Sequence, residues 1–419
     1  MRPLSLRLYR LATALVSPLA PALLRARARR GKEDPERLRE RLGRPSAARP
    51  PGVLVWLHGA SVGESLSLLP LIAALHAQRP DLVTLVTSGT VTSAELMAAR
   101  LPGGVIHQYA PIDTPGAAAR FLAAWTPALG VFVESEIWPN LLLGAKAKGA
   151  KLALLSARLS ERSLKGWARR PAAAHALFSA FDRVMAQDDA AAAALVKLGA
   201  RDDGRLNLKR LAAPPPADPA ALAALAAGAD GRPVLLAAST HAGEDERVLE
   251  AFASLAPCDA LLVIVPRHPV RAAEIAALAA AHGAPAGLRS RGDALGADAV
   301  YIADTLGELG LWFSLADAAF IGGSLLPGPG GHNPVEAAQL DCPIITGPHI
   351  DNWRDIYADL IAADAATVAK DASALAAAFA AALSDPAAAR AQAARAHATF
   401  VRDETALTTA AQALLHLLP

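Results

Sequence analysis

The sequence predicts an α/β protein built from two doubly wound, parallel-sheet domains in tandem. Short runs of apolar residues alternate with segments of helical periodicity along most of the 419 residues. The runs are apolar throughout, which is typical of parallel strands buried on both faces. A Pro-Pro-Pro segment at 212–219 divides them into two series. Ligands of such sheets bind at the carboxyl ends of the strands, and we expect the two domains to face each other across a cleft.

The first 43 residues stand apart from this pattern. Residues 4–24 are largely apolar, carry Arg7 and Arg10 among the leucines, and are followed by a cluster of arginines. The uncharged stretch 11–24 is short for a membrane span, and no small-residue cleavage motif marks a removed signal peptide. We therefore predict an amphipathic helix on the cytoplasmic face of a bilayer, where arginines meet anionic headgroups. The alternative is an ordinary packed helix with a solvated basic end.

The two sheets are predicted from the remaining apolar runs. The first domain is taken as residues 50–211, after a Pro-rich linker, and the second as residues 220–419. The predicted strands of the first domain are 53–57, 82–87, 105–109, 129–133, 151–155 and 184–186. Those of the second are 234–238, 261–265, 299–302, 319–321, 343–346 and 366–368. The alanine-rich stretches between the strands, and residues 372–419, are predicted helices.

Composition argues against several classes of function. The formal net charge of +2 is too balanced for a bulk nucleic-acid binder. Cys258 and Cys342 lie far apart, lack metal-ligand spacing and fit buried thiols of a reduced protein. Five histidines lie at different strand ends, where hydrogen bonding is expected rather than metal ligation: His58, His241, His268, His332 and His349. The sequence contains neither a P-loop nor a clean Gly-x-Gly-x-x-Gly motif.

The motif after the first strand, residues 58–65, places Glu64 at the start of a helix. Small residues allow a tight turn, and Ser61 is positioned to cap the helix. Glu64 then lies in the first turn at a strand's carboxyl end, where the helix dipole favours its ionised form. Such a carboxylate suits a general base that accepts a proton from an attacking hydroxyl. The alternative, a capping-box glutamate three residues after Ser61, fits the spacing equally well.

Two further carboxylates follow the fourth strand. Glu134 and Glu136 share a face in strand geometry, and Trp138 lies beside them. This grouping indicates more than packing, although the Pro-Asn pair that follows is also a helix-start signal. Arg158 ends the next strand and adds a positive charge to the same rim. Lys209 precedes the hinge and is placed to reach the cleft, with a solvated lysine as the alternative.

The loop and helix at 322–347 form the candidate region of the second domain. A loop rich in Gly and Pro follows an apolar strand, and a helix then begins with Asn333 as its cap and Pro334 at its first position. Free backbone N–H groups and the helix N-terminus make this stretch a predicted anion site. In the alternative interpretation, Glu336 only closes a capping box on Asn333.

Other strand ends of the second domain carry polar residues. Arg267 follows a strand and is a candidate clamp for phosphate or carboxylate, because a guanidinium binds both in bidentate geometry. Residues 304–309 follow another strand and are placed to line a base or a ribose. Residues 239–246 repeat the pattern of a strand end, small residues and an acidic helix start.

Taken together, these motifs resemble those of one family, the 3-deoxy-D-manno-octulosonic acid (Kdo) transferases of Gram-negative lipopolysaccharide synthesis. The matching motifs are HGASVGE at 58–64, ESEIWPN at 134–140, SARLS at 156–160, PRHP at 266–269, DTLGEL at 304–309 and GGHNPVE at 330–336. They occur in the family's order and span nearly the whole chain. The basic, apolar N-terminus is similar to the family's membrane segment.

The resemblance implies a GT-B fold and an inverting transfer of Kdo from CMP-Kdo to lipid IVA at the cytoplasmic side of the inner membrane. It implies no catalytic metal and no cofactor. By motif, Glu64 is the expected catalytic base, and Glu136 and Lys209 are expected to stabilise the transition state, with Glu134 as the alternative to Glu136. The expected CMP contacts are Pro266, Arg267, Leu306, Gly307, Glu308, Asn333, Pro334, Val335 and Glu336.

One departure and two alternatives accompany the resemblance. The family usually has Gly-Asn-Leu-Lys before the hinge, whereas this chain has Leu-Asn-Leu-Lys at 206–209, which makes the role of Lys209 less secure than that of Glu64. One alternative is another GT-B enzyme, either a different nucleotide-sugar glycosyltransferase or an epimerase. The other is a membrane-attached binding protein without chemistry, against which the presence of Glu64, Glu136 and Arg267 argues.

Overall fold

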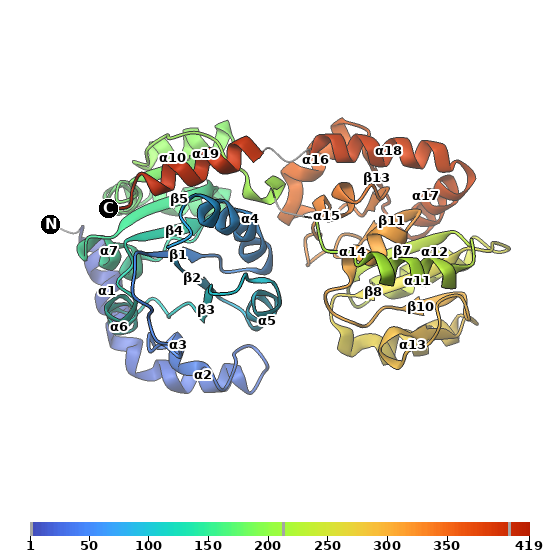
Figure 1. Ribbon diagram of the computed structural model, residues 1–419, viewed down its shortest axis with the longest axis horizontal. Coiled ribbons are helices and arrows are strands. Elements are labelled where there is room, and N and C mark those ends of the chain that lie inside the picture. The colour runs from blue at the N-terminus through green and yellow to red at the C-terminus, as the bar shows by residue number, and fades with distance from the viewer. Residues whose placement is uncertain (1–2, 212–213, 401–403) are drawn as a thin grey trace. The chain divides into compact units, whose positions relative to one another are not determined.

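The structure is a computed structural model that describes residues 3–211, 214–400 and 404–419. The chain divides into two compact units (Figure 1), one of residues Met1–Ala213 with Arg402–Pro419 and one of residues Pro214–Val401. Each unit has the predicted α/β architecture with a parallel sheet. The division falls within the predicted boundary at 212–219, of which residues 212 and 213 lie outside the described part of the chain.

A six-stranded parallel sheet forms the centre of the first unit. Its strand order is β3-β2-β1-β4-β5-β6, the doubly wound order in which the direction of winding reverses between β1 and β4. The strands are β1 (Leu54–His58), β2 (Val83–Ser88), β3 (Ile106–Tyr109), β4 (Leu129–Val133), β5 (Lys151–Ala157) and β6 (Arg183–Ala186). Every residue of β1 and β4 is buried, which accounts for their nearly unbroken apolar sequences.

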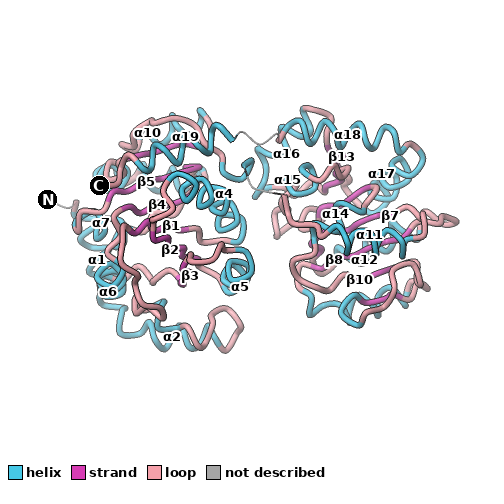
Figure 2. The backbone as a smooth tube through the Cα atoms, viewed as in Figure 1, coloured by secondary structure: helices cyan, strands magenta, loops and turns pink. Residues whose placement is uncertain are grey.

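Helices cover both faces of this sheet (Figure 2). One face is covered by α6 (Pro115–Trp125), α7 (Pro139–Ala147), α9 (Pro171–Phe178) and α10 (Asp189–Lys197). The other is covered by α4 (Val62–Gln78), α5 (Val91–Arg100) and α19 (Glu404–Leu415). The unit also contains α3 (Leu38–Arg41) and α8 (Glu161–Ala168).

The C-terminal helix departs from the predicted domains. The sequence assigns residues 220–419 to one domain, whereas α19 packs on the sheet of the first unit. Leu407, Ala410 and Leu414 of α19 are buried in one cluster with Leu68 and Ile72 of α4. Their spacing of three and four residues predicts a helix with a buried face, but it carries no information about which sheet buries that face.

The N-terminal segment packs on the first unit through one face. Leu6 of α1 (Leu4–Val16) and Leu24 of α2 (Ala20–Ala28) are buried. Residues 1–43 are therefore part of this unit rather than a separate segment. The large apolar side chains that α1, α2 and their connection leave more than half exposed are Leu4, Leu8, Leu11, Leu15, Val16, Leu19 and Leu23. We call the six leucines among them the leucine row. Among the described helices, no single one is long and apolar enough to cross a membrane, and only one pair, α17 (Ala372–Ser384) with α18 (Pro386–Thr399), bent by 105°, passes by length and composition.

The second unit contains a seven-stranded parallel sheet in the order β13-β12-β11-β7-β8-β10-β9. Its strands are β7 (Val234–Thr240), β8 (Leu261–Pro266), β9 (Ala286–Leu288), β10 (Val300–Ile302), β11 (Ala318–Ile321), β12 (Ile344–Thr346) and β13 (Ala366–Val368). One face packs against α11 (Pro219–Ala229), α14 (Leu309–Leu315), α15 (Val335–Gln339), α16 (Arg354–Ala362) and α18 (Pro386–Thr399). The other packs against α12 (Glu244–Ala253), α13 (Ala272–Ala281) and α17 (Ala372–Ser384).

The strands agree with the predicted ones to within about two residues at each end, with one omission. Strand β9 is not predicted, because it is three residues long and has Gly287 at its centre. It forms the edge of the sheet and pairs with β10, so that Leu288 lies opposite Ile302. A short edge strand of this kind has too little apolar sequence to be distinguished from a loop.

Candidate active site

The predicted carboxylates of the first unit meet at the carboxyl ends of β1 and β4. These strands are neighbours at the point where the winding reverses, which is where doubly wound sheets bind ligands. Glu64 follows β1 in the first turn of α4, and Glu134 and Glu136 follow β4. The negative charges of Glu136 and Glu134 both act on Glu64. The sheet topology thus brings together residues that lie far apart in the sequence.

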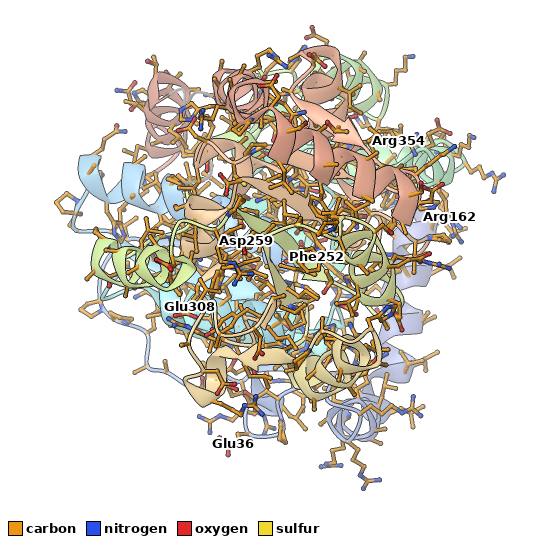
Figure 3. The ribbon with its side chains drawn as sticks, turned by 90° about the vertical axis from the view of Figure 1, so that its right-hand side faces the viewer. Glu36, Arg162, Phe252, Asp259, Glu308 and Arg354 are labelled. Atoms are coloured by element: carbon orange, nitrogen blue, oxygen red, sulfur yellow. The ribbon has the colours of Figure 1, made fainter. Side chains whose placement is uncertain are left out.

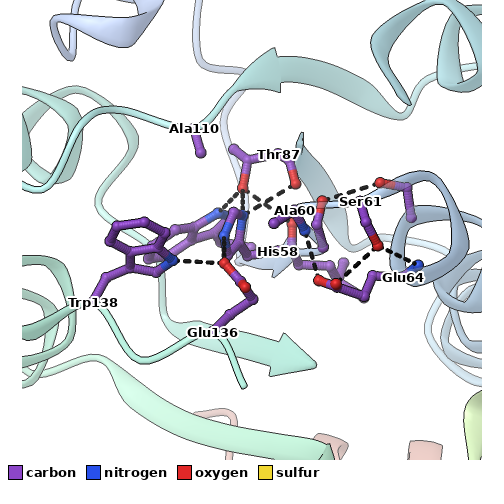
Figure 4. A network of polar contacts seen from close by, with 12 residues as sticks. His58, Ala60, Ser61, Glu64, Thr87, Ala110, Glu136 and Trp138 are labelled. Atoms are coloured by element: carbon purple, nitrogen blue, oxygen red, sulfur yellow. Dashed lines mark hydrogen bonds and ion pairs between the residues drawn. The ribbon is translucent and has the colours of Figure 1, made fainter. Parts of the chain in front are cut away.

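Glu64 is held by the turn that begins α4 (Figure 4). Its Oε2 accepts the Ala60 N–H at 2.8 Å, its Oε1 accepts the Ser61 hydroxyl at 2.8 Å, and Ser61 Oγ accepts the Glu64 N–H at 3.3 Å. A Cβ on Gly59 would lie 2.9 Å from the backbone of Glu64, so glycine is needed for this close approach. The capping role of Ser61 is confirmed. The same contacts fix the Glu64 carboxylate at the strand end, so capping and proton acceptance are compatible.

The pKa of Glu64 is raised above its ordinary value. Burial is the main cause, and the charges of Glu136 and Glu134 raise it further, while hydrogen bonds from Ser61 and Ala60 lower it. The helix dipole favours the ionised form, as expected, whereas burial and the two like charges act in the opposite direction and leave the pKa of Glu64 raised. A raised pKa brings Glu64 closer to neutral pH, where a general base works best.

Glu136 is oriented by a chain of hydrogen bonds (Figure 4). Its Oε2 lies 3.2 Å from His58 Nε2 and 2.7 Å from Trp138 Nε1, and His58 Nδ1 lies 2.9 Å from Thr87 Oγ1. Trp56 Nε1 donates to the same Thr87 oxygen at 2.8 Å. Because an ionised carboxylate only accepts, His58 Nε2–H and Trp138 Nε1–H both donate to Glu136. Burial raises the pKa of Glu136, but the hydrogen bonds from His58 and Trp138 leave it below its usual range.

Glu134 has a different partner from Glu136. Lys209 Nζ lies 2.6 Å from Glu134 Oε1, and the preceding N–H, that of Leu208, donates to Ser156 Oγ at 2.9 Å. Glu134 and Ser156 both adopt positive φ, 55° and 50°. Such backbone costs on the order of 1–3 kcal/mol per residue and is concentrated at functional sites. The structure therefore places the Lys209 ammonium on Glu134, which follows β4.

Asp113, which the sequence does not single out, fastens the N-terminal helix to this site. Its carboxylate accepts the N–H groups of Asn140 at 3.0 Å and Leu141 at 2.8 Å, so it caps α7 directly after the segment of Glu136. The Tyr9 hydroxyl of α1 donates to the same carboxylate at 2.9 Å. Burial raises the pKa of Asp113 in spite of these donors. Helix α1 and the Glu136 segment therefore share one anchoring carboxylate.

In the second unit, Glu244 occupies the backbone donors of the glycine-rich loop. Its Oε1 accepts the N–H groups of Ser324 at 3.0 Å and Leu325 at 2.9 Å, and its Oε2 accepts those of Gly323 at 2.7 Å and His241 at 3.0 Å. The expectation that the loop leaves these N–H groups free for a ligand is wrong for Gly323 to Leu325. An internal carboxylate takes the place of the predicted anion and fixes the loop.

The start of α15 agrees with the prediction in part. Asn333 Oδ1 accepts the Val335 N–H at 3.0 Å, but the helix begins at Val335, so Pro334 rather than Asn333 is its N-cap residue and no side chain caps it. Helix α15 has five residues, so its dipole is small. Pro334 and Val335 are both buried, which leaves their neighbours Asn333 and Glu336 as the side chains of this motif that remain accessible.

Arg267, the predicted clamp for phosphate or carboxylate, lies at the carboxyl end of β8. It follows Pro266, the last residue of β8. Burial lowers the pKa of Arg267, and the nearby charge of Glu336 raises it. His332 stacks on His241, and burial and the charge of Arg267 lower the pKa of His332 to about 3. Arg267, Glu336 and a neutral His332 are thus brought together at the carboxyl edge of this sheet.

The turn after β10 carries the remaining predicted contacts. Leu306 is 73% exposed, and Gly307 has a φ of 86°. Glu308, labelled in Figure 3, pairs with Arg289, whose Nη2 and Nε lie 2.8 Å and 3.1 Å from its two carboxylate oxygens. Arg289 follows the edge strand β9, which the sequence does not predict, and therefore it was not a candidate. Within the described residues, no group of three or more His, Cys, Asp or Glu side chains is placed to hold a metal ion.

The chain is similar in sequence to one family along most of its length. A family model described as 3-deoxy-D-manno-octulosonic-acid transferase (kdotransferase) matches residues 36–209. A probable mitochondrial 3-deoxy-D-manno-octulosonic acid transferase of Arabidopsis thaliana is 34% identical over 385 residues, covering 86% of this chain and 84% of its own. The 3-deoxy-D-manno-octulosonic acid transferase of Bordetella pertussis is 36% identical over 405 residues, covering 93% of this chain and 94% of its own.

Solved structures share the fold at low sequence identity. A glycosyltransferase from Rickettsia africae matches with a TM-score of 0.58 at 12% identity, covering 88% of this chain and 99% of its own. A UDP-GlcNAc 2-epimerase from Neisseria meningitidis matches with a TM-score of 0.55 at 11% identity, covering 88% of this chain and 99% of its own. At such identities the likeness concerns the fold alone.

Proposed function

Because this chain belongs to the 3-deoxy-D-manno-octulosonic acid (Kdo) transferase family, we propose that it transfers Kdo from CMP-Kdo to lipid IVA with inversion at the anomeric carbon. The chain is a glycosyltransferase with the GT-B fold, as predicted. The proposal of a direct displacement assisted by a general base rests on one observation above all. That observation is a partly buried carboxylate with a raised pKa, Glu64, beside a hydrogen-bonded one with a lowered pKa, Glu136.

The proposed reaction is a single displacement. Glu64 accepts the proton of a lipid IVA hydroxyl while the hydroxyl oxygen forms a bond to the anomeric carbon of Kdo. The bond from that carbon to the phosphate of CMP breaks, and its electron pair leaves on the phosphate. Attack from the side opposite the leaving group inverts the configuration. Glu136, held by His58 and Trp138, is proposed to stabilise the positive charge that develops on the sugar.

The second unit is proposed to bind the nucleotide. Arg267 offsets the negative charge of the departing phosphate. A guanidinium is suited to this role because it forms two parallel hydrogen bonds with oxyanions. Asn333 and Glu336 offer accessible amide and carboxylate groups at the same sheet edge. Lys209 in the first unit keeps its proposed role in charge stabilisation, now through its pair with Glu134.

A transfer assay with the product followed by mass tests this function. Purified protein is incubated with CMP-Kdo and lipid IVA, and the lipid is expected to gain the mass of Kdo as CMP is released. The mass gain counts the Kdo units added, and NMR of the product gives the anomeric configuration. An epimerase would change the nucleotide sugar without changing the acceptor, and an unaltered lipid IVA would refute the proposal.

The pH dependence of transfer tests whether the charge of Glu134 acts on Glu64. The charge of Glu134 raises the pKa of Glu64, so removing it in Glu134→Gln is expected to lower that pKa. The ionised base is then present at lower pH, and the acid limb of the kcat/KM profile moves to lower pH. Profiles of the wild type and the variant, measured with saturating CMP-Kdo, check the direction. An unmoved or upward-shifted limb would mean that Glu64 does not set it.

We also propose that the leucine row attaches the protein to the cytoplasmic face of the inner membrane. The row is exposed on α1, α2 and their connection; Arg7, Arg10 and Arg25 lie on the same helices, and Arg29 follows α2 directly. Exposed leucines next to arginines suit insertion among anionic headgroups. The opposite face of α1 is fixed to the first unit by Tyr9, so the row is held in place rather than free to fold inward.

Replacing both Leu8 and Leu15 with serine is expected to weaken binding to anionic vesicles by at least about tenfold. Each leucine that the bilayer buries contributes about 1.5–3 kcal/mol to binding. Both side chains are more than half exposed, so the fold should be unaffected. Sedimentation with phosphatidylglycerol vesicles measures the partition. Val270→Ser, at an 89% exposed site of the second unit, is the matched control. Equal sedimentation of all three proteins would contradict membrane attachment through this row.

A further inference from the structure

The turn that follows β10 is tied to the end of β9 by four side-chain contacts. Arg289 donates to both carboxylate oxygens of Glu308, at 2.8 Å and 3.1 Å. Ser290 donates its N–H at 2.8 Å and its hydroxyl at 2.6 Å to the two carboxylate oxygens of Asp304. Strand pairing sets up these contacts, because Leu288 lies opposite Ile302 and the next residues of both strands leave the sheet together.

The two ties hold the turn from both ends. Asp304 begins it and Glu308 closes it, with Leu306 and Gly307 between them. Thr305 Oγ1 also donates to Glu308 Oε2, on the oxygen that accepts Arg289 Nε. A turn containing an exposed leucine and a glycine at positive φ would otherwise adopt many conformations, so the ties select one.

Glu308 keeps acceptor capacity after these contacts. A carboxylate offers about four acceptor positions, and among the described residues Oε2 accepts two hydrogen bonds and Oε1 accepts one. Its side chain is 26% exposed, so the remaining position is reachable from solvent. The hydrogen bond from Arg289 is the main cause that lowers the pKa of Glu308, which keeps the carboxylate ionised and therefore acceptor-only.

We propose that Arg289 and Ser290 are positioning residues for nucleotide binding: they hold the turn 304–308 so that Glu308 accepts a hydrogen bond from the nucleoside of the donor. The inference rests on the proposed function, because it takes the donor to be a cytidine nucleotide. The donor groups available on that nucleoside are the ribose hydroxyls and the amino group of cytosine, both of which carboxylates accept. Arg289 acts through Glu308 and is not itself a catalytic residue.

The test measures CMP binding to the full-length protein by calorimetry. Arg289→Lys is expected to weaken CMP binding roughly tenfold, because a lysine cannot form the two parallel hydrogen bonds that fix the carboxylate. Ser290→Ala, which keeps the backbone N–H contact, should have a smaller effect. In Glu308→Gln the further change Arg289→Lys should have little effect, because the interaction between the two residues is already lost. With donor saturating, kcat of Arg289→Lys should stay near that of the wild type.

Arg291→Lys is the matched control, since Arg291 pairs with Asp293 in the same short helical turn but makes no described contact with residues 304–308. It should bind CMP like the wild type. Titrations with 2′-deoxy-CMP and with UMP identify the nucleoside group that donates to Glu308. Removing that group from the nucleotide should weaken binding to the wild type but should not weaken binding to Glu308→Gln. If Arg289→Lys bound CMP as tightly as the wild type, or if Arg291→Lys lost as much CMP affinity as Arg289→Lys, the inference would be overturned and the proposed function would stand. A wild type that binds no CMP would overturn both the inference and the proposed function.

Discussion

Glu64→Ala is expected to abolish Kdo transfer while CMP binding stays at the wild-type level. Glu64 lies in the first unit, and the residues proposed to bind the nucleotide all lie in the second. Removing the Glu64 carboxylate should therefore prevent deprotonation of the acceptor hydroxyl without weakening CMP binding. General-base catalysis typically contributes a factor of about 10²–10⁴ in rate. The measurement pairs the mass-based transfer assay with calorimetric titration of CMP.

Two further variants separate the base from the helix cap. Glu64→Gln keeps the size of the side chain and can still accept the Ala60 N–H, so it should fold normally and yet be as inactive as alanine. Ser61→Ala removes the hydroxyl that caps α4 and contacts Glu64, at a typical cost of ~1 kcal/mol in stability, but leaves the carboxylate in place. It should retain most of its activity. If Glu64→Gln transferred Kdo at near-wild-type rates, Glu64 would be a capping residue and the base would have to be sought elsewhere.

The position of Glu64 could be predicted because it depends on local sequence. An unbroken apolar strand, small residues and a serine cap determine where a glutamate stands at the start of a helix, and parallel topology then directs it to the ligand-binding edge. The same reasoning located Glu134, Glu136 and Arg267 at strand ends. The family motifs added the chemistry, since strand ends alone do not specify which sugar is transferred.

Features that depend on long-range packing could not be predicted. The pKa of Glu64 depends on burial and on two carboxylates that follow another strand, neither of which can be read from the start of its own helix. The hydrogen bond from His58 to Glu136 spans 78 residues, and the contact of Tyr9 with Asp113 spans 104. Arg289 was missed because its strand is too short to recognise. Helix α19 was misassigned because its apolar face fits either sheet.

Glu244 illustrates the same limit in the second unit. The sequence predicts a glycine-rich loop whose backbone N–H groups are free to bind an anionic ligand, which is physically reasonable for such a segment. The structure supplies the anion internally, from a helix 79 residues before Gly323. The loop is therefore shaped before any ligand arrives, and its order depends on one buried side chain that is 1% exposed.

Glu244→Gln is accordingly expected to destabilise the second unit by roughly 3 kcal/mol. Each carboxylate oxygen accepts two backbone N–H groups, and a glutamine replaces one oxygen with an NH₂ group that cannot accept them. Two buried donors then lose their partners, at about 1–3 kcal/mol each, with part of the loss relieved by water. Thermal unfolding of the full-length protein and hydrogen exchange at Gly323, Ser324 and Leu325 measure the effect.

The matched control is Glu250→Gln on the same helix. Glu250 has a side chain that is 53% exposed and pairs only with Arg247 among the described residues, and exposed pairs contribute little to stability. It should unfold like the wild type. In Glu244→Gln, exchange should increase at the loop amides first, and CMP affinity should fall with it, because Asn333 and Glu336 follow the same loop. Unchanged exchange at these three amides would mean that the loop keeps its shape without the carboxylate and that its glycines, rather than Glu244, determine its conformation.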